Sequence, residues 1–272
     1  MNTPKSTLIV SVYNDAAALG MIIDSLLDQS AMDFDVIISE DGSSDNIKEV
    51  ITDSGKLPFN LTHLTQEDKG FRKNIALNKA IKQSNTDHLI FIDGDCVPHP
   101  QFITAHQNYL SPGVACSGRR VELGKSFSSK LRNKTYSLNR LTNRLYYLIN
   151  IPYLVYDNAK NVESGIYSKI LQFITQNRKS RLLGCNFSCS KGDLFKVNGF
   201  NEDYKEAGTG EDSDIDWRLT MAGIKVKKIK FSAIQYHLYH PRSYGISQEN
   251  NKLLELTKSS DTYLCENGLK KL

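Results

Sequence analysis

The sequence of this 272-residue chain predicts an α/β fold with a mostly parallel, doubly wound sheet and helices on both faces. Short apolar runs alternate with stretches whose apolar residues recur at helical spacing, which is typical of consecutive βαβ units. Residues 89–92 are apolar at every position, as expected for a strand that is covered on both faces. Carboxylates and glycines follow two of the runs, at the edge where open parallel sheets bind their ligands.

Four strands are predicted in the first third of the chain, at residues 8–13, 34–39, 61–64 and 89–92. A helix is predicted after each of the first three strands. Asn14-Asp15 can cap the first of these helices, in which the apolar residues between 19 and 27 fall on one face. The connections are short, so consecutive strands are expected to lie in one parallel sheet.

Asp93-Gly94-Asp95 directly follows the fourth strand, so both carboxylates are expected at the rim of the sheet. Two carboxylates this close repel each other unless a cation or a hydrogen-bond donor lies between them, and hard divalent metals prefer oxygen ligands. Asp-Gly is also common in solvated turns. The motif taken alone is compatible with either a metal site or a plain turn.

The same rim collects further polar side chains from the other strand ends. The predicted set is Tyr13, Asp15, Asp41, Arg72, Lys73, Asp93 and Asp95. The chain has no glycine-rich dinucleotide motif after its first strand and no P-loop, so a bound phosphate would be held by metal and basic side chains. Arg72 and Lys73 at a helix N-terminus suit that role, although basic residues there are often simply solvated.

Residues 119–181 are predicted to be a basic helical insertion. Residues 119–150 hold eight basic residues and one acidic residue, a net charge of +7. One helix is indicated by leucines at helical spacing, namely Leu138, Leu141, Leu145 and Leu148, and tyrosines crowd its end. Such a helix can bind an anionic membrane surface, or it can pack on its own domain with a solvated basic edge.

Regular structure is predicted to resume with a strand at residues 182–190 and to end with a strand at residues 228–234. Between them, a glycine-rich loop delivers four carboxylates into the start of a helix: Glu211, Asp212, Asp214 and Asp216. The helix dipole accounts for one or two of the four. His237 and His240 follow the last strand and are candidate metal ligands as well as candidate structural histidines.

Composition narrows the class of protein. The 34 basic and 30 acidic residues give a charge of +4, too mild to indicate nucleic-acid binding. The five cysteines include no Cys-x-x-Cys, so neither a zinc site nor a disulfide framework is predicted. No apolar run reaches the roughly 18 residues of a membrane-spanning helix. The first residues show no signal-peptide core, so a cytoplasmic protein is expected, with peripheral attachment to the membrane as an option through residues 119–150.

With these motifs in place, the chain resembles the inverting family-2 glycosyltransferases of the GT-A fold. Asp93-Gly94-Asp95 is similar to their DxD motif, residues 39–45 to their second-strand acidic loop, and Gly210-Glu211-Asp212 to their acceptor-side ED motif. The ordered block from residue 184 to residue 214, which includes Val197-Asn198-Gly199-Phe200-Asn201-Glu202, is similar to the galactosyltransferase-like and chondroitin-polymerase-like members.

The resemblance implies a domain organisation and an activity. The nucleotide-sugar half would be residues 1–118, the helical insertion 119–181, the acceptor-side half 182–241, and a C-terminal tail or helix 242–272. The enzyme would move a sugar from a UDP-sugar to a hydroxyl of a glycan or lipid-linked glycan acceptor, as in surface polysaccharide synthesis, with inversion at the anomeric carbon and with Mn²⁺ or Mg²⁺ as cofactor.

It also implies roles for individual residues. Asp41 would recognise the uracil or ribose, Arg72 would help hold the donor, and the other donor contacts would be Tyr13, Asp15, Lys73, Asp93 and Gly94. Asp95 would hold the metal with Asp93 and His237, and His240 is the alternative to His237. Asp212 would be the catalytic base, and Glu211, Asn186 and Gly210 would bind the acceptor. Thr209 departs from the tryptophan that relatives often carry before the ED motif.

Three rival functions are weighed against this one. A phosphatase of the haloacid dehalogenase type also has Asp-x-Asp after an apolar strand, but normally near the N-terminus and with later lysine and hydroxyl motifs that this chain lacks. A sugar nucleotidyltransferase would need a glycine-rich, arginine-containing loop after the first strand. A non-catalytic sugar-nucleotide-binding relative is disfavoured because Asp212 is retained.

Overall fold

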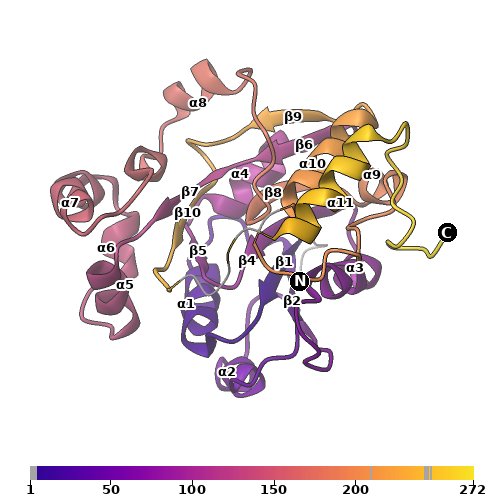
Figure 1. The fold of residues 1–272 in the computed structure, drawn as a ribbon. Coiled ribbons are helices and arrows are strands. Elements are labelled where there is room, and N and C mark those ends of the chain that lie inside the picture. Colours follow the sequence, from indigo (N-terminus) through magenta and orange to yellow (C-terminus); the bar gives the residue numbers. More distant parts are fainter. Residues whose placement is uncertain (1–4, 209, 242–244, 246) are drawn as a thin grey trace.

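The centre of the protein is a seven-stranded sheet (Figure 1). The structure is a computed structural model, and it describes residues 5–208, 210–241, 245 and 247–272. In spatial order the strands of the sheet are β3 (Leu61–Leu64), β2 (Phe34–Glu40), β1 (Ser6–Val12), β4 (His88–Asp93), β8 (Asn186–Ser190), β6 (Val114–Ser117) and β9 (Lys225–Lys228). Only β8 runs antiparallel to its neighbours. The predicted α/β class with a mostly parallel sheet is confirmed.

Helices cover both faces of this sheet because the buried strands carry apolar residues on both sides. In β1, Leu8, Val10 and Val12 join one apolar cluster and Ile9 joins the other. The first cluster includes residues of α1 (Ala16–Leu27), α2 (Ile47–Asp53) and α4 (Phe102–Tyr109), and the second includes α3 (Lys73–Gln83), α9 (Lys191–Lys196) and α10 (Glu211–Met221). The helix α11 (Gln248–Ser259) packs against α10.

A second, three-stranded sheet adjoins the end of β4 and brings distant residues to Asp95. Its order is β5 (Cys96–Pro98), β10 (Ile234–His237) and β7 (Arg119–Glu122). The middle strand, β10, is antiparallel to β5, and this register sets His237 opposite Cys96. The backbone N–H of Leu238 then donates to the carbonyl of Asp95 over 2.9 Å. The strand pairing therefore fixes His237 beside the carboxylate motif.

The predicted last strand at residues 228–234 is wrong. The chain turns between β9 and β10: the backbone N–H groups of Ser232 and Ala233 both donate to the carbonyl of Ile229. Lys228 ends a strand of the large sheet and Ile234 begins one of the small sheet. The alternating apolar pattern reflects buried residues in this crossing, because Ile229, Ala233 and Ile234 are all fully buried.

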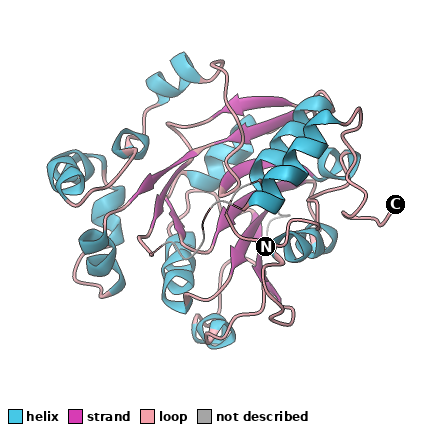
Figure 2. Ribbon diagram, in the orientation of Figure 1, coloured by secondary structure: helices cyan, strands magenta, loops and turns pink. Residues whose placement is uncertain are grey.

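The insertion forms several short helices that lie to one side of the central sheet (Figure 2). They are α5 (Lys125–Arg132), α6 (Leu138–Thr142), α7 (Arg144–Tyr156), the 3-10 helix η1 (Val162–Gly165) and α8 (Lys169–Thr175). The single helix predicted from the leucine spacing is wrong. The chain breaks at Asn143, whose side chain caps α7, so Leu141 is buried while Leu145 is 65% exposed.

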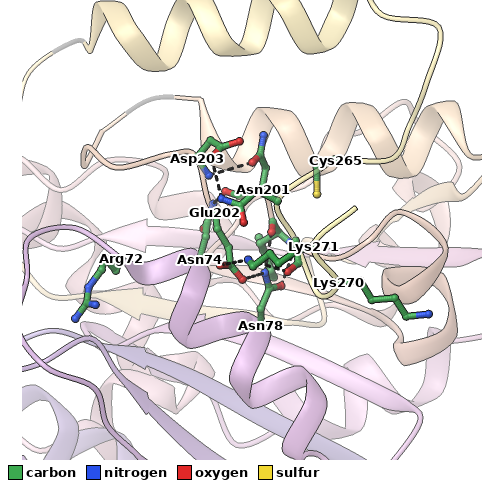
Figure 3. A network of polar contacts seen from close by, with 12 residues as sticks. Arg72, Asn74, Asn78, Asn201, Glu202, Asp203, Cys265, Lys270 and Lys271 are labelled. Atoms are coloured by element: carbon green, nitrogen blue, oxygen red, sulfur yellow. Dashed lines mark hydrogen bonds and ion pairs between the residues drawn. The ribbon is translucent and has the colours of Figure 1, made fainter.

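A network of amide and carboxylate side chains ties α3 to the segment after α9 and to the end of the chain (Figure 3). The Nδ2 group of Asn74 donates to the carbonyl of Asn201 over 2.7 Å. Asn78 Nδ2 donates to the carbonyl of Phe200 and to Glu202 Oε1, and Lys271 pairs with Glu202. The sequence block around residues 197–202 therefore holds in place the helix that begins with Lys73.

Candidate active site

The carboxyl ends of β1, β2 and β4 open into a cavity of about 520 Å³, which we call the β1–β4 cavity. Most of the predicted rim residues line it. Its lining is Ser11, Val12, Tyr13, Asn14, Asp15, Asp41, Gly70, Phe71, Lys73, Asp93, Gly94, Asp95, Ala207 and His240. Parallel strands end at the same edge, which is why side chains from residues 13, 41 and 93 meet there although they are far apart in sequence.

Asp95 lies between two histidines. Its Oδ2 atom is 3.2 Å from Nε2 of His237 and 3.1 Å from Nε2 of His240. Burial acts to raise the pKa of Asp95, but hydrogen bonds from the two imidazoles hold it well below its usual range. The same contact with Asp95 raises the pKa of His240. The structure thus brings both candidate histidines to the carboxylate, where the sequence left the choice between them open.

These three side chains fit a divalent metal. One ligand atom from each of Asp95, His237 and His240 lies within 4.8 Å of the others. A carboxylate oxygen with two imidazole nitrogens suits Mn²⁺ and leaves further positions for phosphate oxygens. Asp93 is not part of this group, and its Oδ1 atom accepts a hydrogen bond from Lys73 at 2.9 Å. Its role as a metal ligand stays a prediction.

Gly94 is required by a close approach of two strands. Its N–H donates to the carbonyl of Ser11 over 2.7 Å, and a Cβ at this position would lie 2.9 Å from the same oxygen. The chain can therefore turn directly over the end of β1 only with glycine between the two aspartates. This turn directs Asp93 toward Lys73 and Asp95 toward the histidines.

Lys73, the first residue of α3, joins the donor side of the cavity to the start of α10. Burial acts to lower the pKa of Lys73, but the charges of Asp93, Asp212 and Glu211 outweigh it and hold the pKa well above its usual value. The cation therefore lies within electrostatic reach of both acidic motifs. It offsets part of the repulsion among three carboxylates that share one region.

Asp41 organises the loop before α3. Its Oδ1 atom accepts a hydrogen bond from Gln66 Nε2 at 2.6 Å, and its Oδ2 atom accepts one from the backbone N–H of Arg72 at 2.7 Å. Burial raises the pKa of Asp41 in spite of these bonds. The guanidinium of Arg72 donates to the carbonyl of Glu67, and Arg72 is not among the residues that line the cavity. Its contact with the donor stays a prediction.

The remaining predicted donor residues lie at the mouth of the cavity. Tyr13 is 57% exposed, so its ring is free to receive a planar ligand. Asp15 accepts a hydrogen bond from the N–H of Ala18 and caps α1, as the sequence predicts. Its two carboxylate oxygens also pair with Arg132 of α5, which leaves Asp15 with a structural task that the sequence did not indicate.

Asp212 lies in the first turn of α10 and is held by a glycine from another segment. Its Oδ2 atom accepts a hydrogen bond from the N–H of Gly184 at 3.1 Å, and a Cβ at residue 184 would collide with the carboxylate. Burial raises the pKa of Asp212 above its usual range against the opposing charge of Lys73. Burial and the neighbouring Asp212 raise the pKa of Glu211 to about 7. A carboxylate with a raised pKa is suited to accept a proton near neutral pH.

The other two carboxylates of the predicted cluster do not reach the site. Asp214 forms a buried ion pair with Arg218 at 2.6 Å, and Asp216 accepts a hydrogen bond from the backbone N–H of Leu182 at 2.9 Å. Glu211 and Asp212, by contrast, both act on the charge of Lys73 at the donor side of the cavity. Gly210 is the N-cap of α10 with a φ angle of 114°, and Thr209 lies outside the described residues.

Asn186 is not placed to bind an acceptor. Its side chain is fully buried, its Nδ2 group donates to the carbonyls of Arg119 and Ala233, and its Oδ1 atom contacts His106 Nε2 at 3.1 Å. All of its polar atoms are therefore used to connect β8 with its surroundings. We assign Asn186 a structural role in place of the expected acceptor contact.

Arg120 and Gln66 act on predicted site residues although the sequence did not single them out, and Gln66 does so through its hydrogen bond to Asp41. Arg120 appeared only as one of many basic residues of the insertion. In the structure its Nη1 atom lies 3.3 Å from Cys185 Sγ, and its charge acts on Asp93, Asp95 and Asp212. Its place in β7, next to β10, could be found only from the pairing of the small sheet.

Fold and site together define a glycosyltransferase of the GT-A class. The model of the family described as glycosyl transferase family 2 matches residues 7–192, so the chain belongs to that family. A second family model, described as the N-terminal domain of galactosyltransferase, matches residues 165–241. The resemblance based on the two acidic motifs and on the block after residue 184 is confirmed.

Named relatives and solved structures agree with this family. The chain is 26% identical to chondroitin synthase of Escherichia coli, over 86% of this chain and 35% of that relative. It is 24% identical to validoxylamine A glucosyltransferase of Streptomyces hygroscopicus subsp. jinggangensis, over 99% of this chain and 61% of that relative. It therefore spans about a third and about three fifths of these relatives. The fold is similar to that of the mannosyltransferase PcManGT from Pyrobaculum calidifontis in complex with GDP-Man and Mn²⁺, with a TM-score of 0.57 at 16% identity over 95% of this chain and 70% of that one.

Proposed function

We propose that this protein is a metal-dependent, inverting glycosyltransferase that moves a sugar from a UDP-sugar to a hydroxyl of a glycan or lipid-linked glycan acceptor. The observation that carries the proposal is the grouping of Asp95, His237 and His240 at the β1–β4 cavity, with Asp212 linked to it through Lys73. This grouping provides separate sites for a metal-bound leaving group and for a base. A phosphatase of the haloacid dehalogenase type has no support from the family or the fold.

The β1–β4 cavity is proposed to take the nucleotide. Tyr13 at its mouth offers an exposed ring, and the half-exposed rim around Asp15 and Gly94 surrounds the space in front of Asp95. Asp41 is buried under the loop at residues 66–72, so we propose that it meets the uracil or ribose through that loop. Asp95, His237 and His240 would hold Mn²⁺ or Mg²⁺, which supplies positive charge against the diphosphate as the bond to the sugar breaks.

Asp212 is proposed to act as the base. The acceptor hydroxyl gives its proton to the Asp212 carboxylate as its oxygen forms the new bond to the anomeric carbon. The bond between that carbon and the diphosphate oxygen breaks at the same time, and the electron pair leaves with the nucleotide. Attack from the face opposite the leaving group inverts the anomeric configuration. Glu211, whose pKa is raised to about 7, is proposed to position the acceptor beside this base, and its place next to Asp212 in α10 supports this.

Calorimetry tests the donor part of this proposal. UDP is expected to bind the wild-type protein only when Mn²⁺ or Mg²⁺ is present, and more tightly than GDP. A panel of UDP- and GDP-sugars, screened for metal-dependent hydrolysis, then identifies the donor sugar. UDP binding that is the same with and without the metal, or a preference for GDP, would contradict the proposed donor and cofactor.

We also propose that the protein is cytoplasmic and attaches peripherally to an anionic membrane through its insertion. No helix within the described parts of the chain is long and apolar enough to cross a bilayer. Residues 119–181 hold thirteen basic and three acidic residues. The surface of α8 is unusually apolar, with Ile170 73%, Phe173 75% and Ile174 59% exposed. Exposed apolar side chains in a segment of net positive charge suit the boundary between anionic head groups and acyl chains.

Vesicle flotation tests the attachment. Wild-type protein is expected to float with vesicles that contain phosphatidylglycerol and to remain at the bottom with pure phosphatidylcholine. Replacing Phe173 and Ile174 by serine removes exposed apolar area, so flotation is expected to fall several-fold without a change in folding. The matched control replaces Leu256 and Leu272, which are 67% and 72% exposed elsewhere on the protein. Equal flotation of the two double variants would refute the role of α8.

A further inference from the structure

A second cavity, of about 570 Å³, is lined by both histidines of the candidate metal group and adjoins the β1–β4 cavity at His240. We call it the basic cavity. Its charged lining consists of Arg120, Glu122, Lys125, Asp157, Lys160, His237 and His240. His240 lines both cavities, so the candidate metal group forms part of the wall between them.

The acidic residues of the basic cavity are already engaged, whereas two of its cations are not. The carboxylate of Asp157 accepts hydrogen bonds from the backbone N–H groups of Ser126 and Phe127 at the start of α5, over 3.1 and 2.7 Å. Glu122 lies 3.8 Å from Arg120. Within the described residues, neither Lys125 nor Lys160 has an acidic partner at ion-pair distance. The lining therefore carries three cations against two carboxylates, a net charge of +1 with the histidines neutral.

Backbone hydrogen bonds make this cavity a built feature of the fold. Glu122 and Lys160 exchange two of them, over 3.0 and 2.9 Å, which fixes Lys160 beside β7. The N–H of Leu123 donates to the carbonyl of His237 over 2.9 Å, so the wall continues into β10. These bonds hold the backbone of Lys160, on the loop after α7, at a set distance from His237 in β10.

Arg120 connects the basic cavity to the reaction centre. It lines the cavity, and its guanidinium also reaches Cys185, the residue that follows the Gly184 contact of Asp212. Its charge acts on Asp212 and on both aspartates of the Asp93-Gly94-Asp95 motif. A molecule held in the basic cavity would therefore contact the same arginine whose charge acts on the proposed base.

We propose that the basic cavity binds an anionic group of the acceptor, with Lys125 and Lys160 as its specificity-determining residues. The inference rests on the proposed function and deepens it. The shared chemistry is a phosphate or carboxylate oxygen, which could belong to a phosphate-linked acceptor or to an acidic sugar. A lysine ammonium recognises either one as a point charge. Because the donor diphosphate is assigned to the β1–β4 cavity, the second set of cations is left for the acceptor.

Binding of small anions to the nucleotide-loaded enzyme tests the proposal. Inorganic phosphate, glucuronate and neutral glucose are titrated at constant ionic strength into protein saturated with UDP and Mg²⁺. At least one of the two anions is expected to bind, and glucose is expected to bind at least about tenfold more weakly. In the Lys125→Ala/Lys160→Ala variant the anion should bind at least about tenfold more weakly, because two charge-assisted hydrogen bonds are lost. The affinity for UDP should not change.

The matched control replaces Lys48 and Lys56, two exposed lysines outside the cavity, by alanine and removes the same net charge. Phosphate binding alone would indicate a phosphate-bearing acceptor, glucuronate binding alone an acidic sugar, and binding of both a site for either anion. The proposal is overturned if neither anion binds, if the two double variants behave alike, or if the anions displace UDP. Failure of the wild-type protein to bind UDP with Mg²⁺ would instead contradict the proposed function.

Discussion

Replacing Asp212 by asparagine is expected to lower the rate of sugar transfer by about 10²- to 10⁴-fold while UDP still binds with its metal. The amide keeps the size of the carboxylate and can still accept the hydrogen bond from Gly184, so the start of α10 should keep its structure. The amide cannot take up the proton of the acceptor hydroxyl, so the variant loses the function of the base. Single-turnover transfer and UDP calorimetry on the same preparation measure the two effects separately.

The control for this variant is Asp216→Asn, which neutralises a carboxylate of the same helix that bonds to the backbone of Leu182. Its transfer rate should stay close to that of the wild type. Because burial raises the pKa of Asp212 and the base acts without its proton, wild-type activity should fall as the pH drops through a value above the ordinary carboxyl range near 4. Equal activity of Asp212→Asn and wild type would assign the base elsewhere.

Replacing Asp95 by alanine is expected to abolish the metal dependence of UDP binding, so that affinity with Mn²⁺ drops to the metal-free level, at least about tenfold. The carboxylate is the one anionic member of the candidate metal group, and without it two imidazoles must hold the cation. Calorimetry with UDP, with and without Mn²⁺, measures the loss. Electron paramagnetic resonance of bound Mn²⁺ reports the same site without any nucleotide.

Asp24→Ala is the matched control, because Asp24 is an exposed carboxylate on α1 away from the cavity lining. It should bind UDP and Mn²⁺ as the wild type does. The variants His237→Gln and His240→Gln extend the comparison to the imidazoles, both of which lie within 3.2 Å of Asp95. If Asp95→Ala still bound UDP in a metal-dependent way, the metal would have to be held by Asp93 or by other residues, and the proposed site would be wrong.

Local patterns were enough to predict the strands in the first third of the chain. The four apolar runs became β1, β2, β3 and β4 within two residues at each end. In β1, β2 and β4 nearly every residue is buried, whereas the edge strand β3 is only partly buried. The single helix within the insertion and the last strand were predicted wrongly for a common reason. Leucine spacing and polar alternation do not report a capping residue such as Asn143, or a turn that moves the chain from one sheet to another, as at Ile229.

The acidic cluster at the start of α10 shows the same limit for side chains. Glu211, Asp212, Asp214 and Asp216 look alike in sequence, but one faces Arg218 and another faces a backbone N–H. Which carboxylate remains available depends on what packs against each face of the helix. Asn186 was predicted to bind the acceptor because it lies in the sequence block that begins at residue 184. Its burial and its contact with His106 show instead that it has a structural role.

By itself, the sequence determined that this protein has a mostly parallel α/β sheet, that Asp41, Asp93 and Asp95 lie at or just after the ends of its strands, and that it resembles family 2 of the glycosyltransferases. Strand ends and glycine turns are local features, so residue type and spacing reveal them. Only the tertiary structure decided that His240 joins His237 at Asp95, that Lys73 links the two acidic motifs, and that Arg120 lines a second, basic cavity. The first and third of these arrangements depend on the pairing of β10 between β5 and β7, and the second depends on the position of α3 near β4 and α10. Both involve contacts between segments far apart in the chain, which no local pattern encodes.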